Sequence, residues 1–308
     1  MPIVPTDRAM TSALCQSCVE KLTAAYDFVR SEILTISTFG RNVWALVIGN
    51  GQRKVLFSAA HHANEWITAT LLLKFAEDLA RAEQTGEALY GIPGRLFAAN
   101  VTVYLVAMVN PDGVDLVTGA LEPDSMEYTQ AEALAANYPW IPFPEGWKAD
   151  LQGVDLTLQY PARWLLARQI KFAQGFTRPG PRDYVGRAPL TQPEPEALAD
   201  YTRRIDPALT LAYHTQGGEI YWSFADYVVP GARELAEEFA RLSGYTVAEP
   251  APQSGNAGYK DWFIQHFRRP GFTIEAGYGA NPLPIGQFDQ IYRDNLGILT
   301  TAALGLPE

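Results

Sequence analysis

The sequence predicts a single α/β domain in which helices flank a β-sheet. Its 308 residues are 47% hydrophobic, which is enough to fill one large core. Short apolar and β-branched runs alternate with segments whose apolar residues recur at helical spacing, and this alternation is typical of α/β sheets. No internal repeat, low-complexity tract or linker divides the chain. One domain over residues 1–308 is therefore the simplest prediction, with residues 1–21 as a candidate N-terminal extension.

The first elements are predicted from their hydrophobic patterns. An amphipathic pattern predicts a helix from Thr11 to Glu32. The runs VWALVIG (43–49) and KVLFSAA (54–60) predict two strands, because both are rich in β-branched and apolar residues. Asn50-Gly51 lies between these strands and predicts that they form a hairpin.

After the second strand the hydrophobic pattern changes its period. Apolar residues at helical spacing predict a helix from Trp66 to Arg81. The run VTVYLVAMV (101–109) is apolar enough to predict a strand that is buried on both faces. Residues 110–195 are rich in Pro, Gly, Trp and Tyr and show little periodicity, so we expect them to form functional surface.

The last third of the chain returns to regular patterns. Thr191 and Glu194 are spaced as a capping box, which predicts a helix that ends at Ile205. Further strands are predicted at 208–213, 219–224 and 271–277, and further helices at 231–242 and 287–304.

Composition and charge exclude several classes of function. The net charge of −10 opposes binding to nucleic acid, and no Lys/Arg cluster provides a local exception. No apolar run approaches the ~20 residues that a membrane-spanning helix needs. The first residues, MPIVPTDRAM, lack the basic and apolar regions of a signal peptide, so we expect a cytoplasmic protein with no membrane partner.

The two cysteines, Cys15 and Cys18, lie in the first predicted helix. A structural zinc would need two further ligands, which no neighbouring residue supplies, and the pair does not follow a strand as a redox motif would. We therefore expect two ordinary, partly buried cysteines.

The segment FSAAHHANEW (57–66) contains the first candidates for metal binding. A catalytic zinc has three protein ligands and an open position for water, and two ligands often come from one short segment. His62 is expected in the turn after a strand and Glu65 in the first turn of the next helix, so both can converge at the carboxyl edge of the sheet. His61 with Glu65 is the competing pair, and we expect His61 to support or pack against the site.

A third ligand must come from the two remaining histidines. His214 ends a predicted buried strand, whereas His266 lies in a helical pattern that favours a packing role. The predicted ligand set is His62, Glu65 and His214. Glu275 interrupts an apolar strand end, where burial raises the pKa of a carboxyl group and suits it to proton transfer, so it is the predicted general base.

Seven motifs together resemble the zinc carboxypeptidase family. In chain order they are HHANEW, VNPDGVDL, GVDLTLQYPARW, PRDYVGRAPLTQPE, HTQGGEIYW, AGYKDWF and GFTIEAGYGANPLP. Their order and spacing are most similar to the bacterial branch, the γ-D-glutamyl-L-diamino acid endopeptidases that cut peptidoglycan stem peptides. The resemblance extends from Leu22 to Leu304.

The resemblance implies one domain with a central mixed, twisted sheet flanked by helices, and one Zn²⁺ as cofactor. It assigns the three ligand positions to His62, Glu65 and His214 and the base to Glu275, in agreement with the interpretation above. It also places Lys148 at, or next to, the position of an arginine that polarises the scissile carbonyl in pancreatic members.

The sequence departs from the exopeptidases of this family where they hold the terminal carboxylate of the substrate. Their Asn-Arg pair is replaced by Thr157 and Leu158, and leucine cannot bind an anion. Lys260 occupies the position that lines the pocket for the side chain on the leaving side, and a cation there suits the second carboxylate of meso-diaminopimelate. Tyr259 and Asn64 complete the candidate substrate-binding residues.

The leading hypothesis is a zinc peptidase that hydrolyses the bond between γ-D-glutamate and a diamino acid in peptidoglycan-derived peptides. A metallocarboxypeptidase for acidic C-termini, anchored by Lys260, is the first alternative. A catalytically silent protein that binds such peptides is the second, although the presence of all four residues of the zinc centre and base argues against it.

Overall fold

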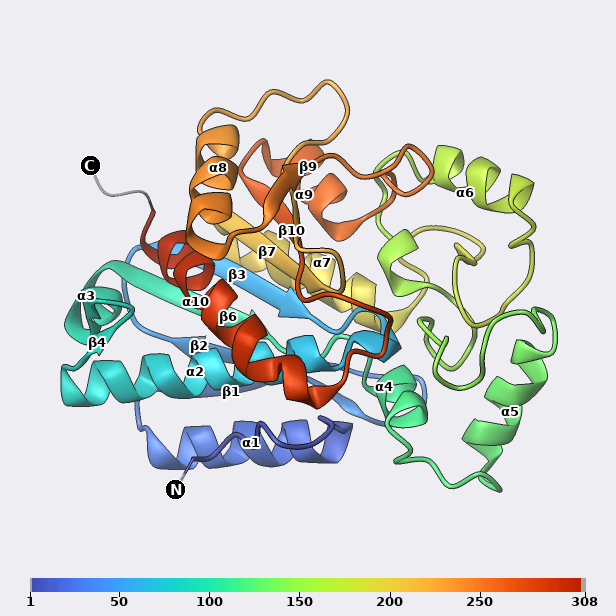
Figure 1. The fold of residues 1–308 in the computed structure, drawn as a ribbon, viewed down its shortest axis with the longest axis horizontal. Helices are drawn as coiled ribbons and strands as arrows, with labels where there is room; N and C mark the ends of the chain where they lie inside the picture. Colours follow the sequence, from blue (N-terminus) through green and yellow to red (C-terminus); the bar gives the residue numbers. More distant parts are fainter. Residues whose placement is uncertain (1, 306–308) are drawn as a thin grey trace.

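An eight-stranded mixed sheet forms the centre of the protein (Figure 1). The structure is a computed structural model, and it describes residues 2–305. The strands are β1 (Arg30–Ile36), β2 (Asn42–Ile48), β3 (Arg53–Ala59), β6 (Val101–Val106), β7 (Leu209–His214), β8 (Glu219–Tyr221), β9 (Thr246–Ala248) and β10 (Gly271–Glu275). Their order in the sheet is β1-β2-β6-β3-β7-β10-β8-β9. A separate two-stranded ribbon joins β4 (Ala88–Leu89) to β5 (Ile92–Pro93).

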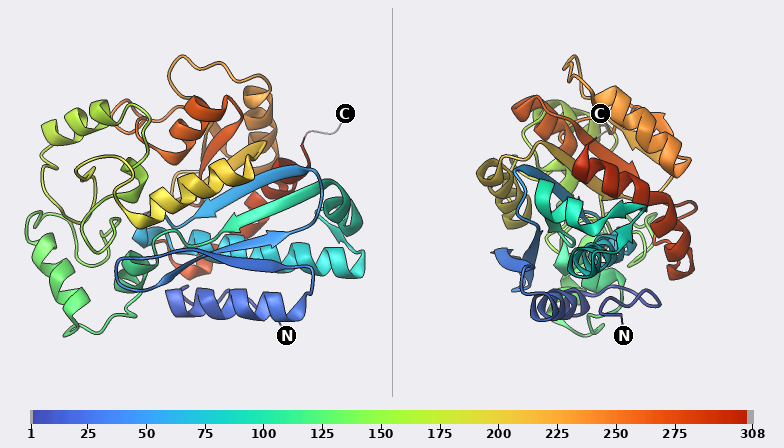
Figure 2. Two further views of the ribbon diagram at one scale, coloured as in Figure 1. Left: turned by 180° about the vertical axis from the view of Figure 1, so that it is seen from behind. Right: turned by 90° about the vertical axis from the view of Figure 1, so that its left-hand side faces the viewer.

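The four middle strands of the sheet are parallel, and antiparallel pairs join them to the flanks. Strands β6, β3, β7 and β10 are parallel neighbours. On one side β2 pairs antiparallel with β6 and β1, and on the other β8 pairs antiparallel with β10 and parallel with β9. In β3 and β7 most side chains are buried on both faces, which explains why their sequences are continuously apolar. The carboxyl ends of the four parallel strands meet at one edge of the sheet, on the side of the molecule that carries the loops around α5 (Met126–Ala135) and α6 (Trp164–Ala173) (Figures 1 and 2).

Helices cover both faces of the sheet. The main ones are α1 (Ser12–Ala25), α2 (Ile67–Thr85), α3 (Gly94–Asn100), α7 (Pro193–Ile205), α8 (Ala232–Ser243), α9 (Tyr259–Phe267) and α10 (Phe288–Leu304). Helices α1, α2, α8 and α10 lie on the face toward the viewer in Figure 1, whereas α7 lies on the opposite face, as the reverse view in Figure 2 shows. The predicted class, an α/β domain with a mixed sheet between helices, is confirmed.

The predicted hairpin between residues 43–49 and 54–60 is wrong, because β6 lies between β2 and β3 in the sheet. Gly51 is needed here for another reason. A Cβ atom on Gly51 would lie 2.0 Å from the backbone of Asn100 and Val101, so only glycine lets the chain entering β6 pass so close. The Asn-Gly signal therefore marks a close crossing of two chain segments and not a turn between paired strands.

The predicted helix from Thr11 to Glu32 is too long. It ends at Ala25, and Arg30–Ile36 forms the edge strand β1, which pairs antiparallel with β2. The helix runs past residue 21, where the candidate N-terminal extension was expected to end. Its buried face packs into the main core through Cys15, Cys18, Val19 and Leu22.

Residues 110–195 contain more regular structure than their pattern predicts. They form α4 (Pro111–Val117), α5 (Met126–Ala135), α6 (Trp164–Ala173) and the short 3₁₀ turn η2 (Leu156–Leu158). These helices are short, and α5 buries only Ala131 and Ala135, so the sequence carries little periodic signal for it.

The predicted capping box at the start of α7 is also wrong. The N-cap residue is Gln192, without a side-chain cap, and the Thr191 hydroxyl bonds instead to Gln159. Glu194 lies in the first turn of α7, but the backbone N–H of Thr191, which a capping box would pair with it, donates to Oε1 of Gln159 at 2.9 Å. Among residues 2–305, no helix combines the length and the apolar character that a membrane crossing requires.

Candidate active site

The turn after β3 places two histidines at the carboxyl edge of the sheet. Ala60 adopts a positive φ of 49°, which ends the strand, and η1 (Ala63–Glu65) begins directly after His62. The Asn110 side chain stabilises this turn, donating to the carbonyl oxygens of His61 at 3.2 Å and Ala149 at 2.9 Å. The turn is therefore fixed by the segment that follows β6.

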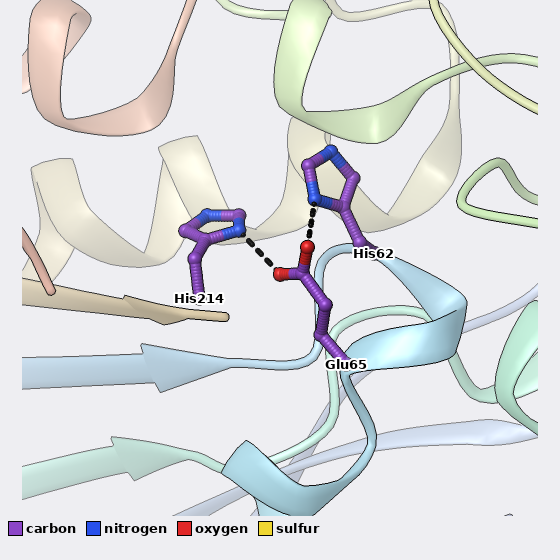
Figure 3. Close-up of side chains that lie close together, drawn as sticks. All are labelled: His62, Glu65 and His214. Carbon is purple, nitrogen blue, oxygen red and sulfur yellow. Dashed lines mark hydrogen bonds and ion pairs between the residues drawn. The ribbon is translucent and has the colours of Figure 1, made fainter. Parts of the chain in front are cut away.

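The three predicted metal ligands converge at this edge (Figure 3). Nδ1 of His62 lies 2.9 Å from Oε1 of Glu65, and Nδ1 of His214 lies 2.8 Å from Oε2 of the same carboxylate. One ligand atom from each residue lies within 4.8 Å of the others. Two imidazoles and one carboxylate are a donor set of catalytic zinc sites, so these residues fit the ion.

The electrostatic surroundings keep Glu65 ionised. Burial alone would raise the pKa of Glu65, but the charges of His62, Lys148 and His214 hold this pKa well below its usual value. Its Oε1 also accepts hydrogen bonds from Lys148 at 2.8 Å and from Asn281 at 3.3 Å. A deprotonated carboxylate is the form that binds a metal ion.

A second set of residues orients His62. Its Nε2 lies 2.9 Å from the Thr157 hydroxyl and 3.3 Å from Oδ1 of Asp155, and Asp155 caps η2. A carboxylate behind a ligand histidine fixes the ring and its tautomer. Thr157, a candidate for substrate binding, thus has its hydroxyl directed at His62 and Asp155.

His61 lies beneath the site and is not part of the ligand cluster. Its ring is fully buried, with Nε2 3.1 Å from the Tyr160 hydroxyl, and it stacks on His214 with ring centroids 5.8 Å apart. Burial lowers the pKa of His61 well below its usual value, so the ring is neutral. The choice of His62 over His61 as the ligand agrees with this arrangement.

Glu275 and Lys148 flank the cluster from two directions. Glu275 is the last residue of β10 and pairs with His214, the last residue of the parallel strand β7. Burial raises the pKa of Glu275 to about 6, and the carboxylate lines the cleft above the cluster. The ammonium group of Lys148 approaches to 3.4 Å from Nδ1 of His62.

The remaining substrate-binding candidates have internal partners. The Lys260 ammonium group donates to the Ser223 carbonyl oxygen at 2.6 Å and forms an ion pair with the adjacent Asp261. The Tyr259 side chain is buried, and its hydroxyl lies 2.9 Å from that of Thr202. Asn64 donates to the Glu145 carbonyl oxygen at 3.0 Å. All three nevertheless line the cleft.

Three residues around the site, Asp155, Asn281 and Arg182, were not predicted from the sequence as site residues. Each lies inside a motif that carries the family resemblance: GVDL, GANPLP and PRDY. Their positions in these motifs were the available signal, but only the folded chain shows that they lie beside the cluster or its cleft.

Residues 14–297 match the family model described as zinc carboxypeptidase. This chain belongs to the zinc carboxypeptidase family. It is 44% identical over 282 residues to gamma-D-glutamyl-L-diamino acid endopeptidase 1 of Lysinibacillus sphaericus, covering 91% of this chain and 68% of that protein.

Two solved structures have the same fold as this chain. Bovine thrombin-activatable fibrinolysis inhibitor, in complex with tick carboxypeptidase inhibitor, superposes with a TM-score of 0.73 at 17% identity, covering 97% of both chains. Carboxypeptidase A from Helicoverpa armigera gives a TM-score of 0.71 at 15% identity, covering 97% of this chain and 74% of that one. The chain is thus a zinc metallopeptidase, in which His62, Glu65 and His214 form the site of one Zn²⁺.

Proposed function

We propose that this zinc peptidase hydrolyses the amide bond between γ-D-glutamate and a diamino acid in peptidoglycan-derived peptides. The observation that carries the proposal is a complete zinc centre with Glu275 beside it, in a chain that is 44% identical to an enzyme named for this bond. Leu158 and Thr157 support it further, since no guanidinium lies at that position to bind the C-terminal carboxylate of an ordinary peptide.

The chemistry follows from the side chains around the cluster. The zinc ion, when bound, acts as a Lewis acid and lowers the pKa of water. Glu275 accepts the proton that the attacking water loses as its oxygen bonds to the carbonyl carbon, and then delivers this proton to the leaving amine as the C–N bond breaks. Lys148 supplies a fixed positive charge beside the oxygen on which negative charge develops.

Lys260 is the proposed contact for the second carboxylate of diaminopimelate. The side chain is 4% exposed, and its ammonium group uses two of its three donors on Ser223 and Asp261, which leaves one donor for the substrate. We expect Lys260→Ala to reduce cleavage before diaminopimelate far more than cleavage before lysine. An equal reduction for both peptides would argue against this contact.

The direct test uses the peptide L-Ala-γ-D-Glu-meso-diaminopimelate. The zinc-loaded protein is incubated with it, with and without a chelator, and released diaminopimelate is followed by mass spectrometry. We expect release only without chelator. A version extended at its C-terminus by D-Ala should release diaminopimelyl-D-alanine under the same condition. Release of acidic residues from ordinary α-linked peptides alone would support the carboxypeptidase alternative. Binding without any release would support the silent one.

A cytoplasmic location remains a prediction of the sequence. Fractionation of cells that express the tagged protein tests it, because peptidase activity should then be recovered with a cytoplasmic marker enzyme.

A further inference from the structure

A cleft of about 590 Å³ opens above the zinc ligands and Glu275. Within the described part of the chain, four cationic side chains line it: Lys148, Lys171, Arg182 and Lys260. Each of the three lysines has a carboxylate within 2.8 Å, provided by Glu65, Asp183 and Asp261 respectively. Their charges are therefore largely compensated inside the protein.

Arg182 differs from these lysines because only one of its nitrogens is engaged. Its Nε donates to Oδ2 of Asp183 at 2.7 Å, and no residue between 2 and 305 accepts a hydrogen bond from its two terminal nitrogens. The side chain is 41% exposed, so water or a ligand can reach those nitrogens. The free edge of a guanidinium is the shape that pairs with a carboxylate through two parallel hydrogen bonds.

The protein holds this guanidinium in place from behind. Oδ1 of Asp183 is bound by Lys171, whose side chain is only 8% exposed. The backbone N–H of Asp183 donates to Oδ2 of Asp155 at 3.0 Å. Lys171, Asp183 and Arg182 together carry one net positive charge. A cation that is already oriented loses less conformational entropy when it binds an anion.

The position of Arg182 is also informative. Asp155 caps η2, the turn that carries Thr157 and Leu158, and Asp155 also accepts the hydrogen bond from Asp183. Arg182 therefore belongs to a different segment from Thr157 and Leu158 but lies beside the turn that they form. The exopeptidases of the family carry their Asn-Arg pair in that turn.

We propose that Arg182 binds a carboxylate of the substrate through its two terminal nitrogens and thereby sets specificity for acidic peptides. This proposal rests on the proposed function, because it concerns the peptide cut at the same site. L-Ala-γ-D-Glu-meso-diaminopimelate carries three carboxylates: the α-carboxylate of D-glutamate and the two of diaminopimelate. The experiment distinguishes among them.

The test compares the parent peptide with three versions in which one carboxylate at a time is a carboxamide. For the wild type, kcat/KM should fall by about 10- to 100-fold for the amide that replaces the carboxylate bound by Arg182, since a charge-assisted contact is lost. Arg182→Met should lose a similar factor on the parent peptide and little more on that amide. It should still discriminate against the other two amides as the wild type does.

Arg178→Met is the matched control, because Arg178 is an exposed arginine of the same loop that does not line the cleft. It should cleave all four peptides like the wild type. Arg182→Lys, which retains the charge without the fork, should recover only part of the lost kcat/KM. Unchanged zinc content of each variant would show that the metal centre is intact.

The proposal is overturned if Arg182→Met loses the same factor on all four peptides, or if no amide costs the wild type activity. The second result needs no variant and so does not depend on how Arg182→Met folds. Failure of the zinc-loaded wild type to cleave any of the four peptides would instead overturn the proposed function, and this inference with it.

Discussion

Glu275 is a carboxylate that lines the cleft without a hydrogen-bond partner among residues 2–305. It is separate from the ligand cluster, so its loss should remove proton transfer and leave metal binding intact. We expect Glu275→Gln to lower kcat by about 10²- to 10⁴-fold. Zinc content, measured by atomic absorption, should equal that of the wild type. A variant that loses zinc in proportion to activity would show that Glu275 acts on the metal site instead.

Glu194 is a buried carboxyl group that does not take part in the proposed reaction. It is 1% exposed, and its Oε2 has no hydrogen-bond partner in the described chain. Burial and the charge of Asp150 raise the pKa of Glu194 to about 8. In the unfolded chain the pKa of a glutamate is ~4.3. Between this pKa and that of the folded state, the unfolded state therefore binds fewer protons than the folded state. The free energy of unfolding should therefore fall as the pH rises from about 5 to about 8.

Glu194→Gln tests this pH dependence, because glutamine has the same shape and stays neutral. Relative to the wild type, the variant should gain on the order of 1 to 3 kcal/mol of stability between pH 5 and pH 8. Urea unfolding at both pH values measures the change. Glu196→Gln, an exposed position on the same helix, is the control. A stability difference that does not vary with pH would contradict the assignment.

Helix α1 packs its apolar face against the rest of the protein instead of extending from it. Leu22 is fully buried in the main core, and Cys15 and Cys18 lie on the same face. Burial raises the pKa of the Cys15 thiol to about 12 and that of Cys18 to about 11, so neither is a reactive thiolate near neutral pH. The helix is thus part of the domain core.

Leu22→Ala should therefore lower the free energy of unfolding by about 2–5 kcal/mol, the usual cost of a cavity in a core. Lys21→Ala, at the exposed neighbouring position, should change it little. Chemical denaturation of both variants measures the difference. Similar small effects would mean that α1 is detached from the core in solution.

The zinc site joins parts of the fold that are distant in the sequence. His62 and Glu65 follow β3, whereas His214 ends β7, about half the chain later. A metal ion that binds only the folded state stabilises it, by about 2.7 kcal/mol when the free ion is at 100 times its Kd. Adding zinc to the metal-free protein should therefore raise Tm, and a chelator should lower Tm and abolish cleavage.

His214→Ala should remove most of the zinc-dependent rise in Tm, since one of three ligands is lost. His266→Ala is the matched control, because His266 stacks on Trp262 in α9 away from the cluster. Differential scanning calorimetry with and without zinc separates the two. An equal zinc response in both variants would place the ion elsewhere.

The sequence alone determined the class of the fold and the identity of the zinc ligands. Strands and helices were predictable where the hydrophobic period is sustained, as in α2, β7 and α10. The ligands were predictable because His62 and Glu65 lie close in sequence and His214 follows a second buried strand, and parallel strands bring such ends to one edge.

Only the tertiary structure decided which strands are neighbours and which side chains support the site. The insertion of β6 between β2 and β3 depends on pairing between distant segments, and local turn signals such as Asn50-Gly51 do not report it. The free guanidinium edge of Arg182 likewise depends on Asp183, Lys171 and the loop that buries them. Spacing along a chain records local geometry, whereas the partners and exposure of a side chain are set by segments that meet only when the chain folds.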